Sequence, residues 1–322
     1  MNAAAAWLAG SLLAASAFGS AAQTAATGAS PTPAASAPDA SIRNDVPLRS
    51  WSLRLPSVDK VVYRGGVSHD AAGMGTGAML YVVPGPVGFL AAVLAHGLVT
   101  NAARQKQKDE LQLAADRVLE PFAPVLDGFT HQQLMQAGLQ RMSVGGSKRL
   151  LTVTEPAGTD WLIESAPVFS MTQDQSALVL DNALRIFAPG ASTVTYAQTV
   201  RVVSAPLIVA AAAPPSPGPS ASGVVPLWLE SQGRRLTDES AALFAESMDI
   251  ALTDASARVG DENAAHKTFR YPEGGSERME RAQPLAERCG RTLIRTLRGW
   301  LMSIPVGLSA GSGQCPAAAP AS

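Results

Sequence analysis

The chain has 322 residues, enough to bury a substantial hydrophobic core, and a formal net charge of −1 at pH 7. This balance excludes attraction to nucleic acid by overall charge, and we expect no nucleic-acid partner. Charged residues make up only 16% of the chain, below the ~25% of an average soluble domain, partly because both ends are rich in alanine, proline and serine.

The N-terminus has the organisation of a secretory signal peptide. An apolar run from Trp7 to Phe18 precedes small residues and a cleavage point near Ala22. No basic residue stands before Arg43, so the alternative is an alanine-rich end without a sorting role. We therefore expect a periplasmic or secreted protein with this organisation: signal peptide 1–22, flexible spacer 23–50, a single domain 51–305 with a Pro/Ser-rich loop at 211–223, and a flexible tail 306–322.

Two β-branched and aromatic runs, residues 58–64 and 78–83, open the folded part and predict two strands. The connection between them is rich in glycine, which indicates a hairpin with a long tip. His69 and Asp70 on this tip would form an acid–base pair only if a nucleophile lay nearby. The GMGTG run at 73–77 lacks the helix that a phosphate-binding loop requires, so we interpret it as part of the tip.

Residues 87–103 carry no charged side chain and would span about 25 Å as a helix. A membrane span needs roughly 20 predominantly apolar residues, and this run is shorter and contains His96. Beyond Ala103 the pattern becomes amphipathic as far as Pro121, where we expect the helix to end. We interpret the stretch as one long helix, or two helices in line, whose apolar half packs on a sheet, and membrane contact by residues 87–103 is the alternative.

A second helix is expected from His131 to Met142, because Thr130 and Gln133 have the spacing of a capping box. Strands with two-residue periodicity and turn-forming connections follow, and they predict an antiparallel meander. The four strands are expected at 149–154, 161–171, 177–187 and 193–203.

After the Pro/Ser-rich stretch, Thr237 is expected to cap a third helix, with acidic residues in its first turn. Residues 267–271 predict a strand and are followed by a polar turn. Residues 291–305 fit a helix or a strand, and their composition favours the strand. The fold class is therefore α+β: a mostly antiparallel sheet, made of the meander, the N-terminal hairpin and the C-terminal strands, packed against a long partly apolar helix and two shorter helices.

Motifs that would carry catalysis are missing from the sequence. It contains no HExxH, CxxC or Walker A pattern. The GxSxG match at 307–311 has neither a following helix nor a later histidine. The four histidines are too scattered to predict a metal site, so we predict no catalytic residue, metal or cofactor.

Residues 267–300 hold eight cationic side chains and four carboxylates. In a strand, Arg291 and Arg295 would point to one face, with Arg298 following. These three arginines form the candidate interaction surface for an acidic partner, either another envelope protein or an anionic envelope component such as lipopolysaccharide phosphate or peptidoglycan. The alternative is a charged edge strand that resists aggregation.

The two cysteines, Cys289 and Cys315, make an even count in a chain expected to be exported. An oxidising compartment favours a disulfide between them, and two free thiols are the alternative. The expected role is a non-catalytic binding, assembly or interaction module of the cell envelope. The alternatives are a periplasmic hydrolase whose site assembles only in three dimensions and a membrane-associated protein.

Overall fold

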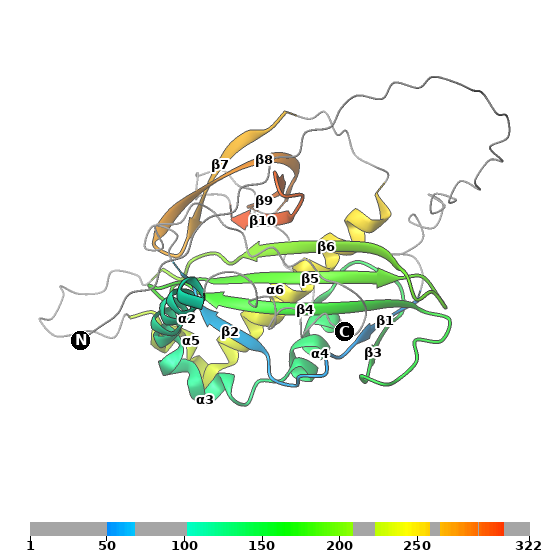
Figure 1. Cartoon of the computed structure of the whole chain (residues 1–322), viewed down its shortest axis with the longest axis horizontal. Coiled ribbons are helices and arrows are strands. Elements are labelled where there is room, and N and C mark those ends of the chain that lie inside the picture. Colours follow the sequence, from blue (N-terminus) through cyan, green and yellow to red (C-terminus); the bar gives the residue numbers. More distant parts are fainter. Residues whose placement is uncertain (1–49, 68–101, 209–222, 258–264, 289, 306–322) are drawn as a thin grey trace, which may run out of the picture. The chain divides into compact units, whose positions relative to one another are not determined.

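A computed structural model of the chain describes residues 50–67, 102–208, 223–257, 265–288 and 290–305 (Figure 1). Ten strands form one large sheet that is mostly antiparallel with some parallel pairs, and the helices are few. The strands are β1 (Trp51–Arg54), β2 (Val62–Gly65), β3 (Lys148–Leu151), β4 (Trp161–Met171), β5 (Leu178–Phe187), β6 (Val194–Val203), β7 (Lys267–Glu273), β8 (Ser276–Arg288), β9 (Arg291–Thr296) and β10 (Leu301–Pro305).

The strand order is β3-β1-β4-β5-β6-β10-β9-β8-β7, and β2 also pairs with β4. Strands β4, β5 and β6 form the predicted antiparallel meander. The prediction that β3 belongs to it is wrong, because β1 lies between β3 and β4 and is parallel to both. Trp51 and Leu53 on β1 are fully buried, and their burial favours this insertion.

The strand predicted at 58–64 is confirmed only in its last part, as β2, which pairs in parallel with the second half of β4. The predicted hairpin partner at 78–83 lies outside the described residues, as do His69, Asp70 and the GMGTG run.

Helix α2 (Ala102–Asp116) is followed by the 3₁₀ helix η2 (Arg117–Phe122) and the short helix α3 (Ala123–Leu126). The expected end at Pro121 is wrong, because α2 already ends at Asp116 and Pro121 lies inside η2. The φ range that is usual for a 3₁₀ helix suits proline. Most of the apolar run 87–103 lies outside the described residues, so its packing on the sheet stays a prediction. None of the described helices is long and apolar enough to cross a bilayer.

Helix α4 (His131–Arg141) starts as predicted. The backbone N–H of Gln133 donates to Thr130 Oγ1 at 3.2 Å, and the backbone N–H of Thr130 donates to Gln133 Oε1 at 3.0 Å. Both halves of the capping box are therefore present.

The last two helices are α5 (Val225–Trp228) and α6 (Glu230–Ser256). The prediction that Thr237 caps a helix is wrong, because Thr237 lies inside α6 and its hydroxyl donates to the Arg234 carbonyl. α6 contains a left-handed turn at Ser231, Gln232 and Gly233, with φ of 52°, 65° and 81°. A Cβ on Gly233 would lie 2.4 Å from Val125 Cγ2, so a glycine is required there for space as well as for conformation.

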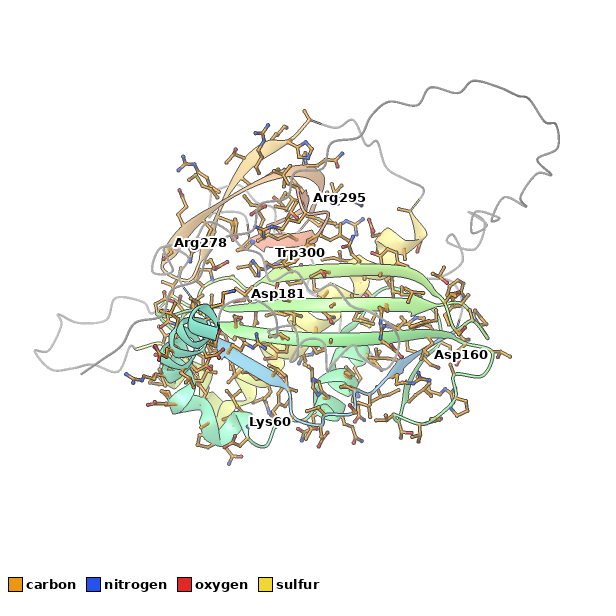
Figure 2. All side chains as sticks on the ribbon, viewed as in Figure 1. Lys60, Asp160, Asp181, Arg278, Arg295 and Trp300 are labelled. Atoms are coloured by element: carbon orange, nitrogen blue, oxygen red, sulfur yellow. The ribbon has the colours of Figure 1, made fainter. Side chains whose placement is uncertain are left out.

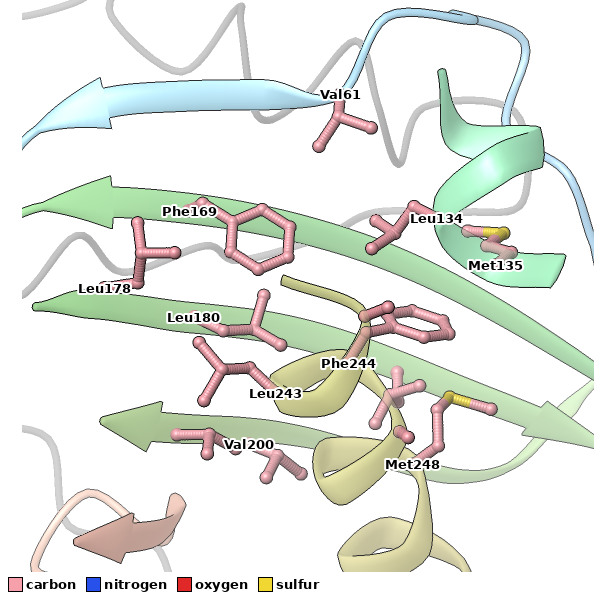
Figure 3. Close-up of a cluster of buried hydrophobic side chains, with 14 of the residues drawn as sticks. Val61, Leu134, Met135, Phe169, Leu178, Leu180, Val200, Leu243, Phe244 and Met248 are labelled. Atoms are coloured by element: carbon pink, nitrogen blue, oxygen red, sulfur yellow. The ribbon is translucent and has the colours of Figure 1, made fainter. Parts of the chain in front are cut away.

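Helix α6 crosses one face of the central strands, with α4 beside it, and the main hydrophobic core lies between these helices and the sheet. Figure 3 shows this core. Each large side chain buried there contributes roughly 1.5–3 kcal/mol. Phe169, Leu180 and Val200 come from the sheet, Leu243, Phe244 and Met248 from α6, and Leu134 and Met135 from α4.

Strands β7 and β8 were expected as one strand and a polar turn, but they form a hairpin. The correction follows from packing: Tyr271 and Ala282 are buried in a second cluster with Val179 and Met302, on the sheet face opposite α6. Asp174, in the β4–β5 turn, accepts a hydrogen bond from the backbone N–H of Gly275 at the hairpin tip. The continuation of the sheet into the C-terminal strands is confirmed, because β10 pairs with β6.

Acid is expected to destabilise the fold through His131, which is 2% exposed. Its Nδ1–H donates to the Val58 carbonyl at 2.7 Å, and burial lowers the pKa of the ring. The unfolded chain therefore binds this proton more readily, so the contribution is present above about pH 6.5 and is lost as pH falls toward the folded-state pKa.

Urea unfolding of the wild type and of His131→Asn between pH 8 and pH 5 would measure this effect. Asparagine retains an N–H for the Val58 carbonyl and does not titrate, so the variant should show a shallower loss of stability in acid. If the stability of the two proteins fell equally between pH 8 and pH 5, His131 would not be the source of the acid sensitivity.

Candidate binding surface

Arg291 belongs to an internal network that joins four elements. Its Nε donates to Glu246 Oε1 on α6 at 2.7 Å and to Ser303 Oγ on β10 at 2.9 Å. Its Nη2 donates to the carbonyl oxygens of Val203 at 2.8 Å and Ser303 at 3.1 Å. This guanidinium therefore ties β9 to β10, β6 and α6.

Arg295 repeats the arrangement further along α6. Its Nη2 lies 2.6 Å from Asp254 Oδ1, and the Tyr196 hydroxyl donates to Asp254 Oδ2 at 3.0 Å. Glu246 and Asp254 lie about two helical turns apart on α6. The alternation predicted for Arg291 and Arg295 is thus confirmed, and both side chains reach carboxylates of the same helix.

Arg298 follows β9 in an exposed turn, with its Cζ 5.9 Å from the centre of the Trp300 ring. Arg201 of β6 also approaches this ring, at 5.7 Å. Figure 2 shows Arg295 on β9 and Trp300 in the turn between β9 and β10. β9 lies between β10 and β8, so the alternative in which these arginines guard an edge strand does not apply to β9. Binding of a partner by the three arginines stays a prediction.

A cationic surface lies on the neighbouring strands β8 and β7. Arg288 pairs with Arg291 in the register, and Gln283 pairs with Arg295, so this side of β8 continues the sheet face on which α6 packs. Arg281 on β8 and Arg270 on β7 share that face. We call the exposed side chains here the ribbon face: Thr268, Arg270, Glu277, Met279, Arg281 and Arg288.

Charge on the ribbon face is largely uncompensated. Arg270 Nη1 lies 2.8 Å from Glu277 Oε1, the carboxylate of this face. No carboxylate of the described residues forms an ion pair with Arg281 or Arg288. Met279 is 62% exposed between these cations. The face thus combines excess positive charge with an accessible thioether side chain.

Charges on the opposite sheet face, by contrast, form internal pairs. Arg201 contacts both carboxylate oxygens of Asp181, at 2.6 and 2.7 Å, and Asp181 holds the pKa of this partly exposed guanidinium above its usual value. Glu164 lies between Arg54 and Arg185, at 3.2 and 2.6 Å. Such pairs align neighbouring strands and leave little charge for a ligand.

A shallow depression of about 420 Å³ lies beside the left-handed turn of α6. Arg141 binds Asp238 there at 2.7 Å, and burial raises the pKa of Glu239. The cationic and carboxylate side chains that line the depression are equal in number, so its charge favours neither an anionic nor a cationic ligand. Its lining consists of Arg141, Glu230, Ser231, Arg234, Arg235, Asp238, Glu239 and Ala242.

The remaining candidates from the sequence contribute no site to the described part of the chain. His131 has a structural hydrogen bond, and the described residues contain no group of His, Cys, Asp or Glu suited to a metal ion. Cys289, Cys315 and the GxSxG match lie outside the described residues, so the disulfide stays a prediction. Sequence reasoning missed the ribbon face, although the alternation of Glu277, Met279 and Arg281 is typical of a strand.

Comparison of the chain with protein-family models, with curated proteins and with solved structures found no match.

Proposed function

We propose that this chain is an exported, non-catalytic binding module of the cell envelope, and that it holds an anionic partner on the ribbon face. The observation that carries the proposal is the cationic surface formed by Arg270, Arg281 and Arg288 around Met279. The chain as a whole is close to neutral, so this charge is local and not a general property of the protein.

The arginines of β9 and those of the ribbon face differ in their partners. Arg291 and Arg295 are neutralised by carboxylates of α6, whereas the described residues offer Arg281 and Arg288 no such carboxylate. A cationic surface of this kind attracts anionic partners and orients them before contact. Met279 adds apolar contact that adapts to the shape of the partner.

Export rests on the signal-peptide pattern at 1–22. Expression of the full chain in a Gram-negative host should give a mature protein in the periplasmic fraction or the medium, with an N-terminus near Gln23 by mass spectrometry. Retention of the intact N-terminus in the cytoplasm would rule out the envelope part of the proposal.

The binding part can be tested with poly-glutamate as an anionic probe. The variant Arg270→Glu/Arg281→Glu/Arg288→Glu should bind the probe at least about tenfold more weakly, and binding by the wild type should fall as salt rises. The matched control is Lys108→Glu/Arg117→Glu/Arg234→Glu, which reverses three exposed cations elsewhere. Equal losses in both triple variants would show that binding depends on total charge, and the ribbon face would lose its proposed role.

A further inference from the structure

Strand β7 ends the sheet, with β8 on one side and no strand of the described residues on the other. Its seven residues make a longer edge than the four of β3, the strand at the opposite end. The outer edge of such a strand presents N–H and C=O groups that an extended chain can pair with. Pro272 suits this position, because edge strands tolerate a missing N–H.

We propose that an extended segment of another protein adds to the outer edge of β7 as the next strand of the sheet, and that this segment alternates acidic and apolar residues. This inference rests on the proposed function, because it names the partner that the ribbon face would hold.

The required alternation follows from the two faces of β7. Thr268 and Arg270 lie on the ribbon face, while Phe269 and Tyr271 point to the other side, where Tyr271 is buried in the second cluster and Phe269 packs against it. Directly opposite side chains on paired strands lie about 5 Å apart. An acidic residue of the added strand would therefore meet Arg270, and an apolar residue on the other face would cover Phe269.

A second copy of this chain fits the edge less well. Two β7 strands paired edge to edge would gather positive charge along the new seam, because Lys267 and Arg270 of each copy are exposed on this strand. Like charges placed across paired strands are destabilising. The same charges favour a partner strand of opposite sign, so the edge is selective for an acidic segment.

The first experiment uses a peptide of about eight residues that alternates glutamate with valine and has both termini blocked, so that its ends carry no charge. It should bind the full-length protein and slow hydrogen exchange of β7 amides. A version N-methylated at alternate residues keeps every charge but loses the strand hydrogen bonds, and should bind at least about tenfold more weakly. If the two peptides bind equally well, strand addition is wrong while charge-driven binding at the ribbon face survives.

The second experiment exchanges the charge at the edge. Arg270→Glu should bind the glutamate–valine peptide more weakly and a lysine–valine peptide more tightly than the wild type does. The control variant Arg117→Glu should keep the wild-type preference. An unchanged preference in Arg270→Glu would exclude pairing at β7. By contrast, undiminished peptide binding after reversal of Arg270, Arg281 and Arg288 together would overturn the proposed function itself.

Discussion

Replacing Gly65 by alanine is expected to lower the free energy of unfolding by about 3 kcal/mol. A Cβ at this position would lie 1.9 Å from the backbone oxygen of Ala115 and 2.8 Å from the backbone nitrogen of Asp116. Both neighbours are backbone atoms at the end of α2, so no side-chain rotation relieves the clash. Either β2 or α2 must move.

Movement at this point would also break hydrogen bonds. The N–H of Gly65 donates to Asp116 Oδ1 at 2.7 Å, and Gln112 Nε2 donates to the Gly65 carbonyl at 3.1 Å. Gln112 donates to Asp116 Oδ1 as well, at 2.7 Å. This small network fixes the C-terminal end of α2 to β2.

Urea unfolding would measure the loss, with Gly128→Ala as the matched control. A Cβ on Gly128 has no neighbour closer than 3.9 Å, so the same chemical change should cost little there. Similar midpoints for Gly65→Ala and the wild type would show that α2 is not seated on β2 as described.

Features set by neighbouring residues could be predicted from the sequence. The capping box at Thr130 and Gln133 depends on a spacing of three residues, and the meander of β4 to β6 depends on alternation and short turns. Both signals are local, because the groups that interact lie close together along the chain.

Other features required contacts between distant residues. Insertion of β1 between β3 and β4 depends on burial of Trp51 and Leu53 beneath helices that occur much later in the chain. The left-handed turn at 231–233 brings Gly233 close to Val125, a residue much earlier in the chain. Neither contact leaves a periodic signal in the local sequence, so the sequence predicted neither a strand at 51–54 nor a turn at 231–233.

The candidate site, too, could be predicted from the sequence only where the signal was local. The sequence placed arginines on one face of a strand, but it gave no reason to pair them with Glu246 and Asp254, which lie on a helix about 40 residues earlier. That pairing separates two groups of cations. Those of β9 fasten the sheet to α6, and those of β7 and β8 remain accessible beyond the helix.

Replacing Arg291 by alanine is expected to cost about 3 kcal/mol of stability, because the change leaves the Glu246 carboxylate without its cation and removes the guanidinium donor from the carbonyl groups of Val203 and Ser303. The side chains of Arg291 and Glu246 are only 22% and 30% exposed, so water replaces these contacts poorly. Arg291→Lys keeps the charge but not the planar guanidinium group, and should lose less stability than Arg291→Ala. A double-mutant cycle with Glu246→Ala should show strong coupling, and additive losses would contradict the network.

The stability lost when each arginine of the candidate interaction surface is replaced by alanine should follow the extent of its internal contacts. Arg295→Ala should cost about 1 kcal/mol, because Arg295 is 39% exposed beside Asp254, and Arg298→Ala should cost little. Binding of poly-glutamate gives an independent readout on the same proteins. If Arg291 acts only within the fold, the folded Arg291→Ala variant keeps full affinity for poly-glutamate while Arg281→Glu loses affinity. A loss of binding in Arg291→Ala as large as that in Arg281→Glu would show that the binding site lies on β9.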